Sequence, residues 1–381
     1  MADNRLKVMT ICGTRPEFIK LSRIIAALDE HTHHVLLHSG QSYDYELNEV
    51  FFEQLKIRKP DYFLGVSGRK VAEAIGEIII KADEAMEREK PEAILIYGDT
   101  NTCLAAIPAK RRKIPIFHME AGNRCFDQRV PEELNRKVVD HLSDINMPLT
   151  EHARRYLVAE GLKPEAVIKT GSCMPEVLHY YREGIASSRA LEELGLTPGG
   201  YFLMSTHREE NVDPEEHLIA ILEALQAAVD EHGKPAVVST HPRTRLRLEA
   251  LAAKGRMAND GRIRFLKPFG FFEYVKLQMN AFCVLSDSGT ITEESAILGF
   301  PAVMLREAHE RPEGMDAGTL VMSGLRPERV LQAIRIITRA PRDPASSEGK
   351  IDDYDDLYVS KKVVRIIISY VDYVNRTVWR K

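Results

Sequence analysis

The chain has 381 residues, of which 44% are hydrophobic and 28% charged, and its formal net charge is −4. A chain of this length usually forms more than one hydrophobic core, so we expect two domains. The mild negative charge argues against an electrostatic nucleic-acid-binding surface, which needs an excess of basic residues. Local groups of basic residues can still bind an acidic small molecule.

The five cysteines are spread along the chain without a CxxC spacing. This pattern favours reduced thiols over a disulfide framework or a zinc site. The first residues, "MADNRLKVMTICG", lead almost at once into a predicted strand and include no apolar signal segment. No apolar run reaches the ~18 residues that a membrane-spanning helix needs. We therefore expect a soluble cytoplasmic protein without membrane insertion.

In the first half of the chain, short apolar runs alternate with longer amphipathic stretches such as "IKLSRIIAALDEH". Buried strands are predicted at 6–12, 34–38, 93–97, 114–119 and 166–170. Strands that alternate with helical patterns are typical of βαβ units in a parallel sheet.

A second series follows the turn "TPGG", with strands predicted at 201–206, 236–240, 263–267, 282–287 and 301–305. The two series predict an α/β protein of two doubly wound parallel-sheet domains. We place the N-terminal domain at 1–175 and the C-terminal domain at 176–358. The apolar, helical tail at 359–381 is expected to pack back on the N-terminal domain.

Unusual polar residues directly follow the predicted strands. In the first half these are "GTRPE", "GDTNT" and "EAGNR", and in the second half "HREEN", "HPR" and "SGT". Ligands of open parallel α/β sheets bind outside the carboxyl ends of the strands. We therefore expect both sets of loops to line one cleft between the domains.

The segment "FHMEAGNRCFDQRVPEELNR" (117–136) is rich in acidic and basic residues. A helix is predicted to begin at Pro131, which suits a first helical turn. Two surface ion pairs at i,i+4 spacing and an apolar stripe toward the core are expected on it: Glu132–Arg136, Glu133–Lys137, and Leu134, Val138 and Leu142.

Glu120 is different, because it comes directly off a buried strand and Gly122 follows two residues later. Burial raises the pKa of a carboxylate and a neighbouring arginine lowers it, so such groups can serve as acid and base. Asp99, in "YGDTNT", is another carboxylate at a strand end. We expect both Glu120 and Asp99 to be functional.

Ser288, Gly289 and Thr290 lie where a predicted strand passes into a helix, so their free N–H groups can hold a phosphate. Glu293 and Glu294 fall in the first turn of that helix, within reach of sugar hydroxyls. The alternative is a plain capping box between Thr290 and Glu293. Neither a Walker A nor a GxGxxG pattern occurs at a strand–helix junction, so bound NAD or ATP is not expected.

His207, in "THREEN", follows a predicted strand and can stabilise negative charge that develops on a leaving diphosphate. Arg15 and Lys20, in "GTRPEFIK", can clamp a phosphate or a sugar. The alternatives are a solvated polar loop around His207 and a turn whose basic residues face water.

Together these motifs resemble the non-hydrolysing UDP-N-acetylglucosamine 2-epimerase family. "GTRPE", "GDTNT", "EAGNR", "PEELNR", "HREEN", "HPR", "DSGTITEE" and "ERPEG" occur in the family's order along essentially the whole chain. The resemblance implies the GT-B fold, in which two Rossmann-like domains face each other across a cleft. It also implies an isomerase that acts on a UDP-sugar, forms a homodimer and needs neither a cofactor nor a metal ion.

The resemblance assigns roles to the matching positions. Asp99, Glu120 and Glu132 would be the acid/base carboxylates, and His207 would stabilise the departing UDP, helped by Arg15 and Lys20. The remaining substrate-binding residues would be Ser288, Gly289 and Thr290 at the diphosphate, Glu294 at the ribose, Tyr274 and Phe269 near the uracil, and Arg136, His241 and Arg311 in the cleft.

The spelling "HMEAGNRCFDQRVPEE" is most similar to one branch of the family. That branch makes UDP-N-acetyl-L-fucosamine from UDP-2-acetamido-2,6-dideoxy-L-talose for capsule or O-antigen synthesis. Asn123 and Cys125 depart from the commoner spelling beside Glu120, and Phe269 stands where many relatives have a polar residue. Gln41 is followed by "SYDYE", unlike relatives that their own substrate activates, so that regulation is not expected. These departures favour a modified sugar.

In the chemistry that the resemblance implies, UDP leaves C1 and the C2 proton is lost, which gives a glycal. UDP then adds back, and a proton arrives on the other face of C2. The leaving group needs electrostatic stabilisation, and proton transfer on two faces needs several carboxylates. Three alternatives stay open: a GT-B glycosyltransferase, a hydrolysing epimerase that releases UDP and free sugar, and a nucleotide-sugar-binding regulator without catalysis.

Overall fold

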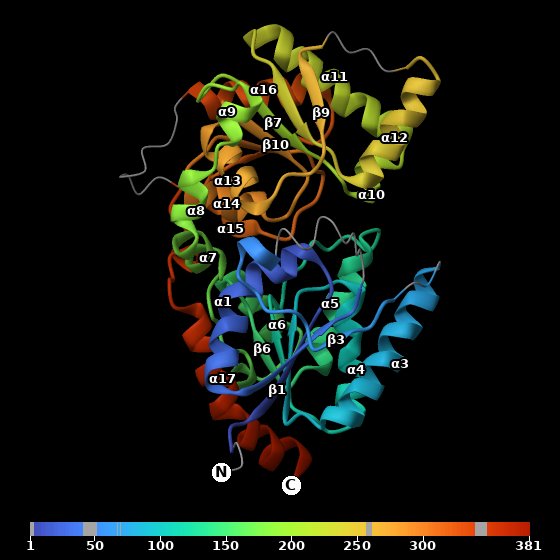
Figure 1. The fold of residues 1–381 in the computed structure, drawn as a ribbon, viewed down its shortest axis with the longest axis vertical. Helices are drawn as coiled ribbons and strands as arrows, with labels where there is room; N and C mark the ends of the chain where they lie inside the picture. The colour runs from blue at the N-terminus through green and yellow to red at the C-terminus, as the bar shows by residue number, and fades with distance from the viewer. Residues whose placement is uncertain (1–3, 41–51, 67, 69, 257–260, 340–348) are drawn as a thin grey trace. The chain divides into compact units, whose positions relative to one another are not determined.

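A computed structural model describes residues 4–40, 52–66, 68, 70–256, 261–339 and 349–381. These residues form two compact units. Unit 1 comprises 1–180 and 355–381, and unit 2 comprises 181–354. Each unit contains one six-stranded sheet flanked by helices (Figure 1). The domain boundaries predicted from the sequence lie after residues 175 and 358.

All strand pairs of the unit 1 sheet are parallel, and the order is β3-β2-β1-β4-β5-β6. The strands are β1 (Lys7–Cys12), β2 (His33–His38), β3 (Tyr62–Phe63), β4 (Ala93–Tyr97), β5 (Ile116–Met119) and β6 (Ile145–Met147). The helices are α1 (Arg15–His31), α3 (Val71–Glu89), η1 (Asn101–Ala105), α4 (Ala106–Arg111), α5 (Pro131–Leu142), α6 (Glu151–Ala159), η2 (Pro164–Ala166), α7 (Met174–Tyr180) and α17 (Val359–Val374), which continues into a π-helical turn (Asn375–Trp379).

Four of the five strands predicted for the first half are present, as β1, β2, β4 and β5. The prediction at 166–170 was wrong, because that segment makes only an isolated bridge between Asn146 and Val167. The strands β3 and β6 were not predicted. They have two and three residues, which is too short for a periodic pattern to identify.

The unit 2 sheet is also parallel, with the order β12-β11-β10-β7-β8-β9. Its strands are β7 (Phe202–Ser205), β8 (Ala236–Ser239), β9 (Ile263–Leu266), β10 (Cys283–Ser286), β11 (Ala302–Met304) and β12 (Val321–Met322). Its helices are α8 (Arg182–Ser187), α9 (Ala190–Leu194), α10 (Glu209–Val212), α11 (Glu215–His232), α12 (Pro242–Ala253), α13 (Phe271–Asn280), α14 (Ile291–Leu298), α15 (Pro312–Asp316), α16 (Pro327–Arg339) and η3 (Asp352–Tyr354). All five strands predicted for the second half are present.

The two sheets have the same topology. When the strands of each unit are numbered from its first strand, both orders read 3-2-1-4-5-6, which is the doubly wound Rossmann order. The order reverses between β1 and β4 in unit 1 and between β7 and β10 in unit 2. The predicted fold class, two Rossmann-like parallel-sheet units, is therefore confirmed. That the units face each other across a cleft stays a prediction.

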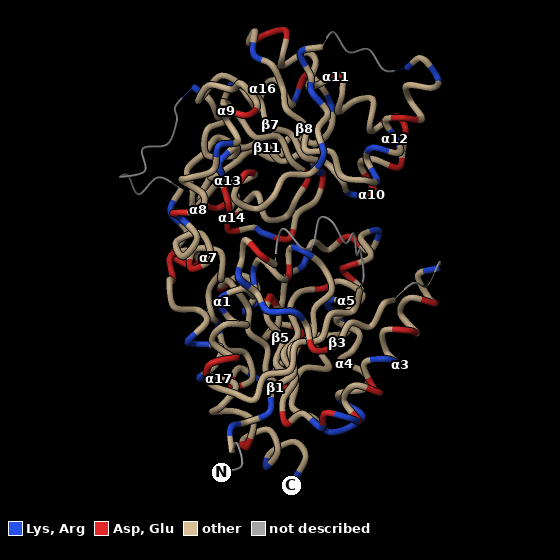
Figure 2. Tube along the Cα trace, in the orientation of Figure 1, with Lys and Arg blue, Asp and Glu red and all other residues tan. Residues whose placement is uncertain are grey.

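The central strands are apolar because helices cover both faces of each sheet. In unit 1, Met9, Ile11, Ile94 and Ile96 form a cluster with residues of α3, α4 and η1. In unit 2, α11 and α16 cover one face of the sheet and α9, α13 and α14 the other. The strands β5, β7, β8 and β11 carry no Asp, Glu, Lys or Arg, as Figure 2 shows in tan. Most Asp, Glu, Lys and Arg residues lie in loops and helices.

The C-terminal helix α17 lies beside α1 in unit 1 (Figure 1). Its buried residues Val363, Ile367, Val371 and Val374 recur every three or four positions and so form one apolar stripe. The backbone N–H of Ser360 donates to Oε2 of Glu176 at 2.8 Å. Among the helices of the described residues, none is long and apolar enough to cross a membrane.

Candidate functional site

In unit 1 the loops that follow β1 and β4 meet at the point where the strand order reverses. Glu17 of α1 links them. Its Oε2 accepts hydrogen bonds from the N–H groups of Gly13 (2.6 Å) and Thr14 (3.2 Å), and its Oε1 accepts one from the Thr100 hydroxyl (2.7 Å). Burial raises the pKa of Glu17 to about 7, although these hydrogen bonds oppose the shift. One buried carboxyl therefore fixes both loops.

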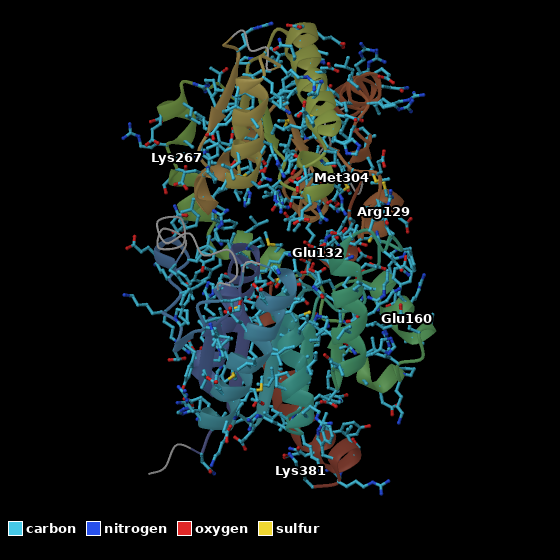
Figure 3. The ribbon with its side chains drawn as sticks, turned by 90° about the vertical axis from the view of Figure 1, so that its right-hand side faces the viewer. Arg129, Glu132, Glu160, Lys267, Met304 and Lys381 are labelled. Carbon is cyan, nitrogen blue, oxygen red and sulfur yellow. The ribbon has the colours of Figure 1, made fainter. Side chains whose placement is uncertain are left out.

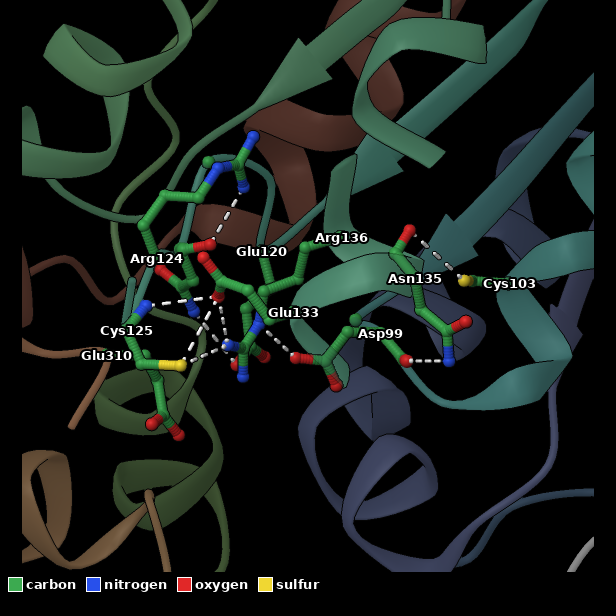
Figure 4. A network of polar contacts seen from close by, with 12 residues as sticks. Asp99, Cys103, Glu120, Arg124, Cys125, Glu133, Asn135, Arg136 and Glu310 are labelled. Carbon is green, nitrogen blue, oxygen red and sulfur yellow. Dashed lines mark hydrogen bonds and ion pairs between the residues drawn. The ribbon is translucent and has the colours of Figure 1, made fainter. Parts of the chain in front are cut away.

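Asp99 lies two residues beyond the end of β4 and is held by α5. Its Oδ2 accepts a hydrogen bond from Nε of Arg136 at 2.6 Å, and its backbone carbonyl accepts one from the Asn135 side chain at 2.9 Å. The second arm of the guanidinium, Nη1, reaches Glu133 at 3.0 Å (Figure 4). Arg136, whose side chain is 4% exposed, therefore bridges two carboxylates.

Glu120 occupies the loop after β5, the strand next to β4 in the sheet. Its Oε2 accepts a hydrogen bond from Nζ of Lys20 at 2.8 Å, and its Oε1 accepts one from Nδ2 of Asn123 at 3.3 Å. The side chains of Lys20 and Glu120 are 8% and 11% exposed. Glu120 also has a φ of 61°, a left-handed conformation that non-glycine residues rarely adopt and that often marks functional sites.

The predicted surface role of Glu133 was wrong, because its side chain is fully buried. It accepts hydrogen bonds from the N–H groups of Cys125 (3.1 Å) and Phe126 (3.2 Å). Burial opposes ionisation of Glu133, but these donors and Arg136 outweigh it and lower its pKa. Lys137 lies on the exposed side of α5.

The predicted apolar stripe of α5 was also wrong at Leu134 and Val138, although Leu142 packs against the core cluster of unit 1. Leu134 and Val138 are 58% and 39% exposed, whereas Val139 and Asp140 are buried. The helix buries a partly polar face because polar groups at the ends of β4 and β5 supply partners for it. A hydrophobic-periodicity argument cannot anticipate such a face.

Glu132 and Arg15 occupy the first turns of their helices. Glu132 is the second residue of α5 and is half-buried (Figure 3). Arg15 is the first residue of α1 and is also half-buried. Unit 1 thus carries Arg15, Lys20, Asp99, Glu120, Glu132 and Arg136 at the carboxyl ends of β1, β4 and β5 and on the helices that follow.

In unit 2 another buried carboxylate, at a different position in the sheet, also links two loops. Oδ2 of Asp287, just beyond β10, accepts hydrogen bonds from the Thr206 hydroxyl (2.6 Å), the N–H groups of His207 (3.0 Å) and Arg208 (3.0 Å), and the Asn211 amide (3.1 Å). Asp287 is 0% exposed. It therefore joins the loops after β7 and β10, where the order of this sheet reverses.

The His207 ring lies at the surface of this arrangement. Its side chain is 41% exposed, and its Nδ1 is 3.3 Å from Oδ1 of Asp287. The ring of His241, from the loop after β8, lies 5.7 Å away between centroids. A carboxylate at Nδ1 orients an imidazole ring and leaves Nε2 available to a ligand. His207 and His241 can therefore present hydrogen-bond donors to a ligand.

The segment Ser288–Thr290 leads from β10 into α14 as predicted. The hydroxyls of Ser288 and Thr290 are 3.0 Å apart, and the N–H groups of the following helix start offer an anion site. A Cβ added to Gly289 would lie 2.4 Å from Oε1 of Glu310. The carbonyl of Gly289 accepts a hydrogen bond from Nε of Arg311 at 3.1 Å.

Arg311 is 2% exposed and holds this loop through its hydrogen bond to Gly289. Its Nη2 lies 3.1 Å from Oε2 of the buried Glu293. Glu294 accepts a hydrogen bond from the Gln278 amide at 2.6 Å. Among the residues predicted near a uracil, Tyr274 and Phe269 pack against the core on the side of α13 and α14.

The comparison of unit 1 with unit 2 identifies two residues that the sequence did not single out for a role, Glu17 and Asp287. Both lie inside quoted motifs, "GTRPE" and "DSGT". A carboxylate one turn into a helix, or directly after a strand, is a signal that could have identified them. The predicted regulatory difference at Gln41 lies outside the described residues.

Comparison with known proteins decides the family. The family model described as UDP-N-acetylglucosamine 2-epimerase matches residues 26–368. The chain belongs to this family. Members of the family are isomerases, which confirms the predicted enzyme class.

Three relatives illustrate the range of the family. The UDP-N-acetylglucosamine 2-epimerase of Rickettsia bellii is 58% identical, with a TM-score of 0.92 over 99% of this chain and 100% of that one. The UDP-GlcNAc 2-epimerase of Methanocaldococcus jannaschii, solved in complex with UDP-GlcNAc and UDP, is 31% identical, with a TM-score of 0.89 over 96% and 100%. The UDP-2,3-diacetamido-2,3-dideoxy-D-glucuronate 2-epimerase of Pseudomonas aeruginosa is 34% identical over 87% of this chain and 92% of the relative.

Proposed function

We propose that the protein is a non-hydrolysing 2-epimerase of a UDP-2-acetamido sugar. The observation that carries the proposal is the pairing in unit 1. Asp99 and Glu120 follow neighbouring strands, and each accepts a short hydrogen bond from a nearly buried cation, Arg136 or Lys20. A relative of known structure was solved with UDP-GlcNAc and UDP, which supports a UDP-sugar as the ligand.

The reaction explains the residue types. The C2 proton of an acetamido sugar is not acidified by a carbonyl at C1, so direct abstraction is slow. In the proposed route the C1–O bond breaks with its electron pair going to UDP, and a base takes the C2 proton, which leaves a C1–C2 double bond. UDP then adds back to C1, and an acid returns a proton to the opposite face of C2. No oxidant or reductant is consumed.

Proton transfer on two faces needs more than one carboxyl group. Asp99, Glu120 and Glu132 supply them in this proposal. Lys20 and Arg136 hold the two strand-end carboxylates in place through hydrogen bonds of 2.8 and 2.6 Å.

The UDP would be held by unit 2. His207, oriented by Asp287, would stabilise the negative charge that develops on the leaving diphosphate. The segment Ser288–Thr290 would bind phosphate oxygens through N–H and hydroxyl donors. Glu294, Tyr274, Phe269 and His241 would bind the nucleoside and adjacent groups, with Arg311 supporting the loop.

For the sugar, we propose UDP-2-acetamido-2,6-dideoxy-L-talose, which the reaction would convert to UDP-N-acetyl-L-fucosamine. Asn123, one of the two positions that depart from the commoner spelling, donates to Glu120 at 3.3 Å. The other, Cys125, donates from its Sγ to Oε2 of Glu133 at 3.3 Å, and Glu133 pairs with Arg136. Both departures therefore contact the carboxylate network that would surround the pyranose, which supports a modified hexose. The homodimer that the family resemblance implies also stays a proposal.

Solvent deuterium tests the reaction. Incubation of each UDP-sugar in D₂O without any acceptor should return UDP-sugar with deuterium at C2 and the epimer at equilibrium. A suitable panel is UDP-GlcNAc, UDP-2-acetamido-2,6-dideoxy-L-talose and UDP-2,3-diacetamido-2,3-dideoxy-D-glucuronate. UDP release that needs an acceptor and leaves C2 undeuterated would indicate a glycosyltransferase. Free sugar as the end product would indicate a hydrolase, and binding without turnover a regulator.

Two variants test the roles. Asp99→Asn and Glu120→Gln should each lower turnover by at least about 10²-fold while UDP still binds, because most of the residues proposed to bind UDP lie in unit 2. Rates near wild type in both variants would remove these carboxylates from the mechanism.

A further inference from the structure

A buried histidine lies on β5, close in sequence to Glu120 and in contact with the residue that precedes Asp99. His118 is the third residue of β5, and its side chain is 1% exposed. Its Nε2 is 2.9 Å from the carbonyl oxygen of Gly98, at the end of β4. Its Nδ1 is 2.9 Å from Oδ1 of Asp140, on α5. The ring thus spans the space between a strand-end loop and a helix.

The partners of the ring fix its protonation state. The Gly98 carbonyl can only accept a hydrogen bond. Asp140 also accepts from Nη1 of Arg124 at 2.8 Å and from the N–H of Gly122 at 3.1 Å, so it serves as an acceptor throughout this network. Both ring nitrogens of His118 must therefore donate, so the ring is an imidazolium.

The surrounding charges are consistent with this assignment. Burial by itself lowers the pKa of His118, but the hydrogen bond and charge of Asp140, the Gly98 carbonyl and the charge of Asp99 together raise it. Arg124 contacts Asp140 and also pairs with Glu160 at 2.7 Å. Two cations and two carboxylates therefore balance in this network, with Asp99 as a further nearby anion.

The network ends at the backbone of both functional loops. Gly98 directly precedes Asp99, and Gly122, which Asp140 holds, lies two residues after Glu120. Gly98, Glu120 and Gly122 have φ values of 69°, 61° and 81°. A left-handed glutamate is costly and persists only where its surroundings enforce it. The hydrogen bonds of Asp140 and Lys20 supply that enforcement around Glu120.

We propose that the His118 imidazolium and the Asp140 carboxylate form a positioning pair that sets the placement of Asp99 relative to Glu120. The proposal rests on the proposed function, in which these two carboxylates transfer protons at C2. Neither member of the pair is exposed, so neither touches the substrate. A displacement of about 1 Å between reacting groups can lower a rate by about 10²-fold. Loss of the pair is therefore expected to lower the rate although neither residue contacts the substrate.

Two substitutions separate the two hydrogen bonds of the ring. His118→Asn keeps an amide N–H near the Nδ1 position toward Asp140, and His118→Gln keeps one near the Nε2 position toward Gly98. Each breaks the connection between the two loops. We expect kcat to fall about 10²-fold in both, whereas KM and the Kd for UDP stay within about threefold of wild type.

Unit 1 contains a matched control. His34, on β2, is also a buried ring between a carboxylate and an oxygen, with Nδ1 2.6 Å from Asp29 and Nε2 2.8 Å from the Thr10 hydroxyl. It is the second residue of its strand, in the amino-terminal half, away from the functional loops. His34→Gln should leave kcat near wild type. An equal loss of kcat in His34→Gln would overturn the proposal, because the effect would then be general to buried His–Asp pairs.

A spectroscopic test on the unaltered protein avoids the risk that a variant does not fold. Ring ¹⁵N shifts of histidine-labelled enzyme should show one imidazolium that persists above the usual histidine pKa. A neutral His118 ring at pH 7, or unchanged kcat per folded enzyme in both His118 variants, would overturn the proposal. Failure of the proposed function would look different, since Asp99→Asn and Glu120→Gln would then retain activity.

Discussion

Arg136 donates from Nε to Oδ2 of Asp99 at 2.6 Å, across 37 positions of the sequence. The same guanidinium reaches Glu133 at 3.0 Å. One side chain thus connects a carboxylate at the end of β4 to a fully buried carboxylate on α5. The two contacts use different nitrogens of one planar guanidinium, so a side chain with the same positive charge but another shape cannot make both.

Arg136→Lys and Arg136→Met should therefore both impair the enzyme. Lysine keeps the charge but cannot bridge two carboxylates as a planar guanidinium does. We expect kcat to fall about 10-fold in Arg136→Lys and about 10²-fold in Arg136→Met. Removing one partner of a buried ion pair should also lower the free energy of unfolding of Arg136→Met by about 3–5 kcal/mol. Steady-state kinetics and urea denaturation measure the two effects.

The control for this pair is Arg129, which forms an ion pair with Asp127 in the same segment but is 82% exposed. Arg129→Met should change the free energy of unfolding by less than about 1 kcal/mol. Equal losses in the free energy of unfolding for Arg129→Met and Arg136→Met would show that burial does not make the Arg136 ion pairs more important for stability.

Glu17 gives a prediction about pH. Its pKa is raised from 4.5 to about 7, so the folded chain binds a proton that the unfolded chain releases near its usual pKa. Between these values the unfolded state holds fewer protons. The contribution of Glu17 to the free energy of unfolding therefore falls as pH rises through this window, by about 3 kcal/mol in total.

Glu17→Gln removes this titration. The difference in free energy of unfolding between the variant and the wild type should shift in favour of the variant as pH rises from about 5 to about 8. Urea denaturation at several pH values measures it. Parallel curves for the two proteins would mean that Glu17 titrates normally.

Gly122 should not tolerate a side chain. A Cβ there would lie 2.4 Å from the carbonyl oxygen of Ala153, and its φ is 81°. Gly122→Ala should cost about 2–5 kcal/mol of stability and displace Glu120, with loss of activity. Gly161→Ala is the control, since its φ is 92° but no atom lies within 4 Å of the added Cβ. It should cost about 1 kcal/mol and leave kcat unchanged.

Asp287→Asn tests the loop that would bind the diphosphate. An amide cannot accept every hydrogen bond that Oδ2 now accepts from Thr206, His207, Arg208 and Asn211. We expect the Kd for UDP to rise about 10- to 100-fold, by calorimetry, because each buried donor left unpaired costs about 1–3 kcal/mol. Asp230→Asn, an exposed substitution on α11, should leave UDP binding as it is.

The sequence predicted most central strands to within two residues, because buried parallel strands read as short apolar runs. It missed β3, β6 and β12, which are too short to show a pattern. It also predicted that Leu134 and Val138 face the core, and both are exposed. That error has a physical cause: α5 packs polar residues against the strand ends, so hydrophobic periodicity does not report its buried face.

For the candidate site, the sequence identified residues but not pairs. Position after a strand was enough to single out Asp99, Glu120 and His207, since the carboxyl ends of parallel strands collect ligand-binding residues. Which cation serves which carboxylate depends on contacts between segments far apart in the chain, such as Lys20 with Glu120 across 100 positions.

The sequence by itself thus determined the fold class, the family and the strand ends that carry functional groups, because these follow from local patterns and ordered motifs. Only the tertiary structure decided that Glu133 is buried and that Glu17 and Asp287 each link two loops of their own unit. It also decided that His118 links the loop after β4 to α5. Hydrogen bonds between distant segments are set by how strands and helices pack, and no local pattern records them.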